Sequence, residues 1–216
     1  MIGDGRSVEP YTRPMMQRGR MEAFSDGVFA VAITLLALNL MVGGPDHMSL
    51  LHKLLHQWPV FAAYVVSFFT IGIIWVNHHS LFDLMIRVDR PLLFLNLLLL
   101  SFVVAIPFAT TTLATYLREP GSSGTTAGVL YAGVMEGMSL SFTIIFVHAL
   151  RAGLLIAAPP PEERRVAVLR FGLGSVAYLV VMLLSLVSPV ATLVSAAVLA
   201  GYYMFQRTPD VPGDEP

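Results

Sequence analysis

The sequence contains no cysteine and few charged residues, and both absences limit what the chain can be. Without cysteine, neither a disulfide framework nor a thiolate metal site is available. Only 12% of the 216 residues are charged, whereas 56% are hydrophobic, which is far from the balance of a soluble domain. The composition therefore predicts an all-α integral membrane protein embedded in a lipid bilayer.

Several motifs of enzymes and of other channels are also missing. The sequence has no Gly-rich phosphate loop, no H-E-x-x-H zinc motif and no G-x-S-x-G nucleophile. It also lacks the T-V-G-Y-G carbonyl filter of ordinary potassium channels. We therefore predict that the chain is not an enzyme, that it holds no cofactor or resident metal, and that it has no nucleic-acid partner.

Long intervals without charge predict the membrane-spanning helices, since about 20 apolar residues are needed to cross a bilayer. The intervals are residues 24–42, 58–78, 91–117, 125–150 and 171–206. The last one is too long for a single span, and Ser188-Pro189 is expected to divide it into two short helices. Pro107 is expected to kink the third helix without ending it. The sequence therefore predicts six transmembrane helices per chain.

The basic residues lie almost entirely on one side of these spans. Eleven of the 13 Lys and Arg residues precede the first span, follow the last, or lie in the second and fourth connections. The opposite side holds only Lys53 and Arg118. The excess of positive charge predicts a multi-pass protein of the cell (inner) membrane with both termini in the cytoplasm.

The same reasoning divides the chain into three segments. Residues 1–19 are predicted to form a polar cytoplasmic segment, and residues 20–207 the transmembrane domain. Residues 208–216, which are polar and rich in proline, are predicted to form a disordered cytoplasmic tail.

Three polar residues in the predicted spans leave alternatives open. His78 and His79 are adjacent, so their side chains point about 100° apart on a helix, and a polar cluster is favoured over a shared metal site. Glu136 lies within a span, where an acid either handles ions, is simply protonated, or is paired with a neighbouring helix. A proton-linked secondary transporter that uses Glu136 and the two histidines is therefore an alternative function.

The first span carries an apolar stripe behind a charged beginning. The large apolar residues recur at alternating spacings of four and three residues, as Phe24, Val28, Val31, Leu35 and Leu38. Thr34 falls in the same stripe. Packing against another helix would explain such a stripe, and Ser25 and Asp26 could simply cap the start of the helix.

The beginning of this span resembles a known family signature. Residues 20–26, R-M-E-A-F-S-D, resemble the Arg-x-x-x-Phe-Ser-Asp signature of the transmembrane protein 175 family of lysosomal and bacterial potassium channels. The resemblance extends to F-A-V-A-I-T-L-L directly afterwards and to W-V-N-H-H-S-L-F at the end of the second span. It implies a potassium-preferring cation channel of four subunits, whose central pore is lined by the first helix of each.

The resemblance also implies roles for individual residues. Val31, Leu35 and Leu38 would form a hydrophobic constriction, and Thr34 would be the polar residue near its narrowest level. Potassium passing through the pore would be the only metal ion held. A network at the cytoplasmic end would fix the first helix, and its members would be Arg20, Phe24, Ser25, Asp26, His78 and His79. Because the signature occurs only once, a symmetric pore requires several copies in a closed homo-oligomer.

The predicted topology can be tested by single-cysteine labelling, which the absence of native cysteine makes straightforward. Cysteines introduced at Ser7 and Asp214 should react with an impermeant reagent only from the cytoplasmic side, because the basic residues favour that side for both termini. Cysteines at Asp46 and Ser122 should react only from outside. Labelling of either terminus from outside would contradict the six-span topology.

Overall fold

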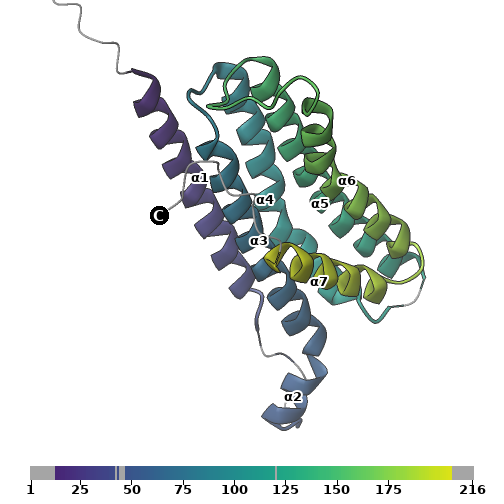
Figure 1. Cartoon of the computed structure of the whole chain (residues 1–216). Coiled ribbons are helices and arrows are strands. Elements are labelled where there is room, and N and C mark those ends of the chain that lie inside the picture. Colours follow the sequence, from purple (N-terminus) through teal and green to yellow (C-terminus); the bar gives the residue numbers. More distant parts are fainter. Residues whose placement is uncertain (1–12, 42, 44–46, 120, 206–216) are drawn as a thin grey trace, which may run out of the picture.

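The computed structural model describes residues 13–41, 43, 47–119 and 121–205, which form seven helices and their connections (Figure 1). The helices are α1 (Arg13–Ala37), α2 (Leu50–His56), α3 (Trp58–Asp83), α4 (Arg90–Tyr116), α5 (Ser122–Arg151), α6 (Arg164–Ser185) and α7 (Pro189–Phe205). The predicted tail, residues 208–216, lies outside the described residues, as do residues 1–12 of the predicted N-terminal segment.

Helix lengths agree with the prediction of an all-α membrane protein with several apolar helices. Among the described residues, α3, α4, α5 and α6 are long and apolar enough to cross a bilayer. Helix α7 is apolar but has only 17 residues. Helix α1 has 25 residues but contains Arg20, Glu22 and Asp26. That α1 and α7 also cross the bilayer, which would make six spans, therefore stays a prediction.

The predicted break at Ser188-Pro189 and the continuation of the helix past Pro107 are confirmed, whereas the kink at Pro107 stays a prediction. Helix α6 ends at Ser185 and α7 begins at Pro189, so the long apolar interval is divided where the sequence indicated. Helix α4 continues through Pro107 to Tyr116. Helix α2 was not predicted; the side chain of Ser49 caps it by accepting a hydrogen bond from the backbone N–H of His52 at 3.4 Å.

The bounds of the first helix differ from the predicted range of 24–42. Helix α1 begins about three turns earlier, at Arg13, because the helical conformation extends into the charged segment that hydropathy excludes. It ends at Ala37, where Leu40 N–H donates to the Ala37 carbonyl in a tight turn at 3.1 Å. The side-chain amide of Asn39 donates to the Leu35 carbonyl at 3.4 Å, so a terminal carbonyl that the helix leaves free is bonded.

Helix α4 lies at the centre of the bundle, where it packs against α1, α3 and α5 (Figure 1). Helix α1 contacts chiefly α3 and α4 and lies at an edge of the bundle, whereas α6 packs against α5 and α7. The α3–α4 and α5–α6 connections meet in an antiparallel bridge between Met85 and Leu155. The two Arg-rich connections predicted to be cytoplasmic therefore lie side by side.

The buried apolar residues form two clusters along the bundle. One includes Phe29, Leu36 and Ile106 and joins α1, α3, α4, α5, α6 and α7. The other includes Met21 and Phe82 and lies at the end that carries the Arg-rich connections. Both clusters receive residues from α1, so the buried face of this helix is fixed against the bundle at two levels.

Small residues allow α5 to approach α6 and α7 closely. A Cβ atom on Gly128 would lie 2.8 Å from Thr192 Oγ1 and 2.9 Å from Ser185 Cβ, whereas one on Gly133 would lie 3.7 Å from Met182 Cε. Ser185 and Thr192 are fully buried. An added methyl group at Gly128 must therefore displace two helices, whereas the same group at Gly133 fits.

We expect Gly128→Ala to destabilise the folded chain by about 1–3 kcal/mol, the usual cost of overpacking. Gly133→Ala is the matched control on the same helix and should leave stability close to that of the native chain. Thermal unfolding of the two purified variants in detergent would measure the difference. Equal melting temperatures for both variants would show that α5 does not pack as described.

Candidate functional site

Helix α1 has one buried face and one face that none of the described residues covers. Ala32 and Leu36 are buried in the core, with exposed fractions of 0% and 2%. Val31 and Leu35, their immediate neighbours in sequence, are exposed by 55% and 36%. Adjacent residues on a helix point about 100° apart, so Val31 and Leu35 lie on a different side of α1 from the packing face. Val28, another member of the predicted stripe, is half-buried and packs against the core.

The exposed face contains the residues that the family resemblance implies for the pore. Val31 and Leu35 lie on it, and Thr34 is exposed beside them. Phe24, predicted to belong to the anchoring network, is exposed on the same face. Leu38 is 66% exposed but lies in the turn after the last helical residue, Ala37, so it is not held by the helix itself. The predicted helical stripe therefore includes Leu35 but not Leu38.

Thr34 keeps its hydroxyl close to its own helix. Its Oγ1 donates to the Val31 carbonyl at 2.8 Å. A hydroxyl oxygen retains acceptor lone pairs when it donates. The Thr34 oxygen can therefore still act as an acceptor on the exposed face while its hydrogen is bonded within the helix.

A chain of buried polar side chains joins α1 to α3 and α4. Asn96 Nδ2 donates to Ser25 Oγ at 2.9 Å, and Asn96 Oδ1 lies 2.9 Å from His78 Nε2. An amide oxygen only accepts, so Nε2 of His78 carries a proton in this arrangement. Ser25 in turn donates to the Met21 carbonyl at 2.9 Å. We call Ser25, Asn96 and His78 the buried polar link.

The buried polar link lies between the two apolar clusters. Met21 belongs to one cluster and Phe29 to the other, and Ser25 is between them on the buried face of α1. The His78 ring also packs edge-on against Phe29, with 5.4 Å between the ring centroids, and in a tilted arrangement against Phe82, with 4.5 Å between the centroids. Polar groups enclosed in this way are costly to leave unpaired.

The other predicted members of the anchoring network have different positions. Asp26 Oδ1 accepts a hydrogen bond from the indole N–H of Trp75 at 2.8 Å, in an exposed position. His79 is exposed and packs beside Trp75, whereas Phe24 is 55% exposed. The structure therefore brings Ser25 and His78 into one network through Asn96, and it places Asp26 and His79 beside Trp75.

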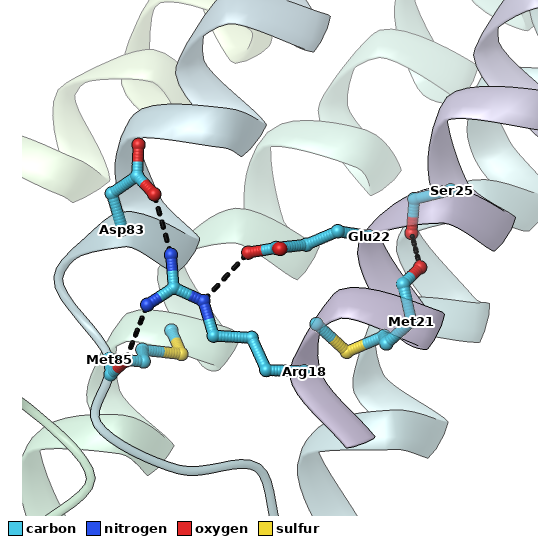
Figure 2. A network of polar contacts seen from close by, with 6 residues as sticks. All are labelled: Arg18, Met21, Glu22, Ser25, Asp83 and Met85. Atoms are coloured by element: carbon cyan, nitrogen blue, oxygen red, sulfur yellow. Dashed lines mark hydrogen bonds and ion pairs between the residues drawn. The ribbon is translucent and has the colours of Figure 1, made fainter. Parts of the chain in front are cut away.

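An arginine that sequence reasoning missed holds α1 near its N-terminal end. Figure 2 shows the Arg18 guanidinium group between Glu22, Asp83 and the backbone of Met85. Its Nε donates to Glu22 at 2.7 Å, one terminal nitrogen to Asp83 at 2.5 Å and the other to the Met85 carbonyl at 2.9 Å. We call this set the Arg18 clamp. It ties α1 to the end of α3 and to the connection that follows.

Helix geometry explains why Arg18, and not Arg20, makes these contacts. Arg18 precedes Ser25 by seven residues, so the two share the buried face of α1. Arg20 precedes Val31 by eleven residues, or about three turns, and is exposed with the stripe. Comparing both arginines with the stripe could have revealed this difference from the sequence.

Glu136 lies in another part of the bundle from the histidines. It is on α5 beside Ser175 of α6, and its Oε2 atom is buried without a hydrogen-bond partner among the described residues. His78 contacts α1 and α4 instead. The structure therefore does not bring Glu136 and the histidines together in one site.

Comparisons with known proteins agree with this geometry. The family profile described as "Endosomal/lysosomal potassium channel TMEM175" matches residues 20–107. A potassium channel of Streptomyces collinus is 48% identical over 200 residues, which cover 90% of this chain and 95% of the relative. A potassium channel of Chamaesiphon minutus is 39% identical over 195 residues, which cover 87% of this chain and 93% of the relative.

A solved structure has the same fold. The crystal structure of a lysosomal potassium-selective channel TMEM175 homologue from Chamaesiphon minutus superposes with a TM-score of 0.76 at 36% identity, covering 88% of this chain and 97% of that chain. The fold and the matches define a multi-pass membrane protein that is an ion channel and not an enzyme. The chain belongs to the TMEM175 family of potassium channels.

The buried polar link can be tested at Asn96. Asn96→Leu keeps a similar volume but leaves His78 and Ser25 without their shared partner, so we expect a loss of about 1–3 kcal/mol in stability. Asn77→Leu, on the exposed side of α3, is the control and should change stability little. Thermal unfolding and the yield of assembled protein measure both variants. A melting temperature unchanged by Asn96→Leu would contradict an anchoring role.

Proposed function

We propose that four copies of this chain form a closed homo-oligomer with a central potassium pathway lined by the exposed face of α1. Residues 20–207 form the channel domain, and both termini lie in the cytoplasm. The observation that carries the proposal is the division of α1 into a buried packing face and an uncovered face. Each chain has a single signature, so a symmetric pore requires several copies. The family resemblance implies four copies, which would surround the pore with rotational symmetry.

The composition of α1 favours a pore over a lipid contact for its uncovered face. Arg20 lies on that face and Thr34 borders it, and Asp26 is only partly buried. Charged side chains are costly against lipid and usually face the bundle interior or water. Helices α3, α4, α5 and α6 are long and apolar enough to cross a bilayer, whereas α1 carries Arg20, Glu22 and Asp26.

Apolar side chains on the uncovered face would form the narrow part of the pathway. Val31 and Leu35 are one helical turn apart, about 6 Å along the axis, so each would contribute a ring in a four-fold assembly. Leu38 would contribute a third ring from the turn after α1. Apolar rings oppose ion passage because they cannot replace the water around an ion.

Potassium preference is supported by the relatives and by the chemistry of Thr34. The Streptomyces collinus protein is a potassium channel at 48% identity, and the solved Chamaesiphon minutus protein is a potassium-selective channel. A ring of Thr34 hydroxyl oxygens beside the constriction would offer neutral acceptors to a partly dehydrated cation. No carbonyl filter of the T-V-G-Y-G type is needed.

Proton-linked transport is the second candidate. Its supporting observation is the buried, unpartnered Oε2 atom of Glu136. Single-channel recording in a planar bilayer separates the two classes, because a carrier turns over too slowly to give unitary current steps. Unitary steps carried by potassium are expected.

The gate can be tested by changing Leu35 and its buried neighbour. Leu35→Ala should raise potassium flux and lower discrimination against sodium, because it widens an apolar ring. Leu35→Asn should raise leak further, because it wets the ring. Reconstituted flux, normalised to the amount of correctly assembled oligomer, is the measurement.

Leu36→Ala is the matched control for the same experiment. Leu36 is buried, so truncation should cost about 2–5 kcal/mol of stability and lower the yield of protein. The normalised flux and the potassium-to-sodium ratio should stay native. If Leu35 and Leu36 variants behave alike after normalisation, Leu35 does not line the pathway.

A further inference from the structure

Helix α2 presents two histidines on one exposed face. His52 and His56 are four residues apart, so they are neighbours on the helix surface with Cβ atoms about 6 Å apart. Both side chains are exposed. In Figure 1, α2 lies beyond the ends of α1 and α3, at the opposite end of these helices from the start of α1.

This spacing suits a transition metal. Neutral imidazole is a common ligand for Zn²⁺ and also suits Ni²⁺ and Cu²⁺, whereas Mg²⁺ and Ca²⁺ prefer oxygen. Two histidines at positions i and i+4 can coordinate one ion from a single helix, as in helical zinc motifs. His78 and His79 cannot do this, because one is buried and the other is exposed.

The ends of α2 are fixed, which keeps the pair in register. Ser49 caps the beginning of the helix, and Gln57 N–H donates to the Lys53 and Leu54 carbonyls at 3.1 Å. The Gln57 side chain also reaches the Gly43 carbonyl at 3.5 Å. The residue after His56 is therefore linked to the connection that follows α1.

We propose that His52 and His56 form a binding site for a divalent transition metal, Zn²⁺ or a similar ion, on the non-cytoplasmic side of the membrane. An ion bound there would restrain α2 and the connection after α1, and so change potassium flux. This second effect rests on the proposed pore. In the described part of the chain no third His, Cys, Asp or Glu completes the site, so water or a neighbouring copy supplies the other ligands.

The site is tested by titrating Zn²⁺ into the purified full-length oligomer by calorimetry. His52→Gln should weaken binding about tenfold or more, because one ligand cannot replace a chelating pair. His47→Gln, in the same connection but outside α2, should bind as the native chain does. Equal affinities for His52→Gln and the native chain would overturn the site.

Two double variants separate chelation from the number of histidines. His52→Gln with Leu51→His keeps the histidine count but places the pair five residues apart, about 140° around the helix, so weak binding should persist. His56→Gln with Leu55→His places the pair three residues apart on one face, so binding should recover. Leu51 and Leu55 are both exposed. Native Zn²⁺ affinity in the first double variant would overturn the proposal of a chelating pair. Weak Zn²⁺ binding in the second double variant would overturn it as well.

Flux measurements test the coupling separately. Zn²⁺ added on the non-cytoplasmic side should change potassium flux through the native chain but not through His52→Gln. Binding without any change in flux would overturn the coupling and leave the site standing. A native chain that carries no potassium would overturn the proposed pore, while the calorimetric result would still decide the site.

Discussion

The position of α1 depends on the buried polar link between Ser25, Asn96 and His78. Apolar packing provides little preference between helices in a bilayer, because lipid is as apolar as a leucine side chain. Hydrogen bonds have a defined partner and direction, so they favour one rotation and one register. Asn96 uses its amide group to donate to Ser25 on α1 and to accept from His78 on α3, and so it holds three helices together.

Rotation of α1 about its axis decides which residues lie on the uncovered face. With Ser25 held inside, residues seven positions earlier and later also point inward, and Arg18 is one of them. Its contacts with Asp83 and Met85, near the N-terminal end of the helix, therefore favour the same rotation of α1 as the buried polar link does. Arg20 and Val31 consequently share the opposite, exposed side.

Sequence reasoning found the family and most helices, because these depend on local patterns. The signature at 20–26 lies within the region that the family profile matches, and charge-free intervals located α3, α4, α5 and the α6–α7 break. Asn96 was missed, although a single amide in the run L-F-L-N-L-L-L-L is a signal of a buried polar contact. Its partners come from α1 and α3, which no local pattern identifies.

The end of α1 was also misplaced, because hydropathy and backbone conformation are different properties. Residues 38–42 carry no charge, so charge-free length extends the predicted span to residue 42, whereas the tight turn at Asn39 and Leu40 ends the helix. The consequence concerns the proposed constriction. Leu35 is fixed by the helix and its buried neighbours, whereas Leu38 belongs to the connection that leads to α2. In the proposed constriction, a movement of α2 would therefore displace the Leu38 side chain more readily than the Leu35 side chain. The ring at Leu35 would be fixed, and the ring at Leu38 would be adjustable.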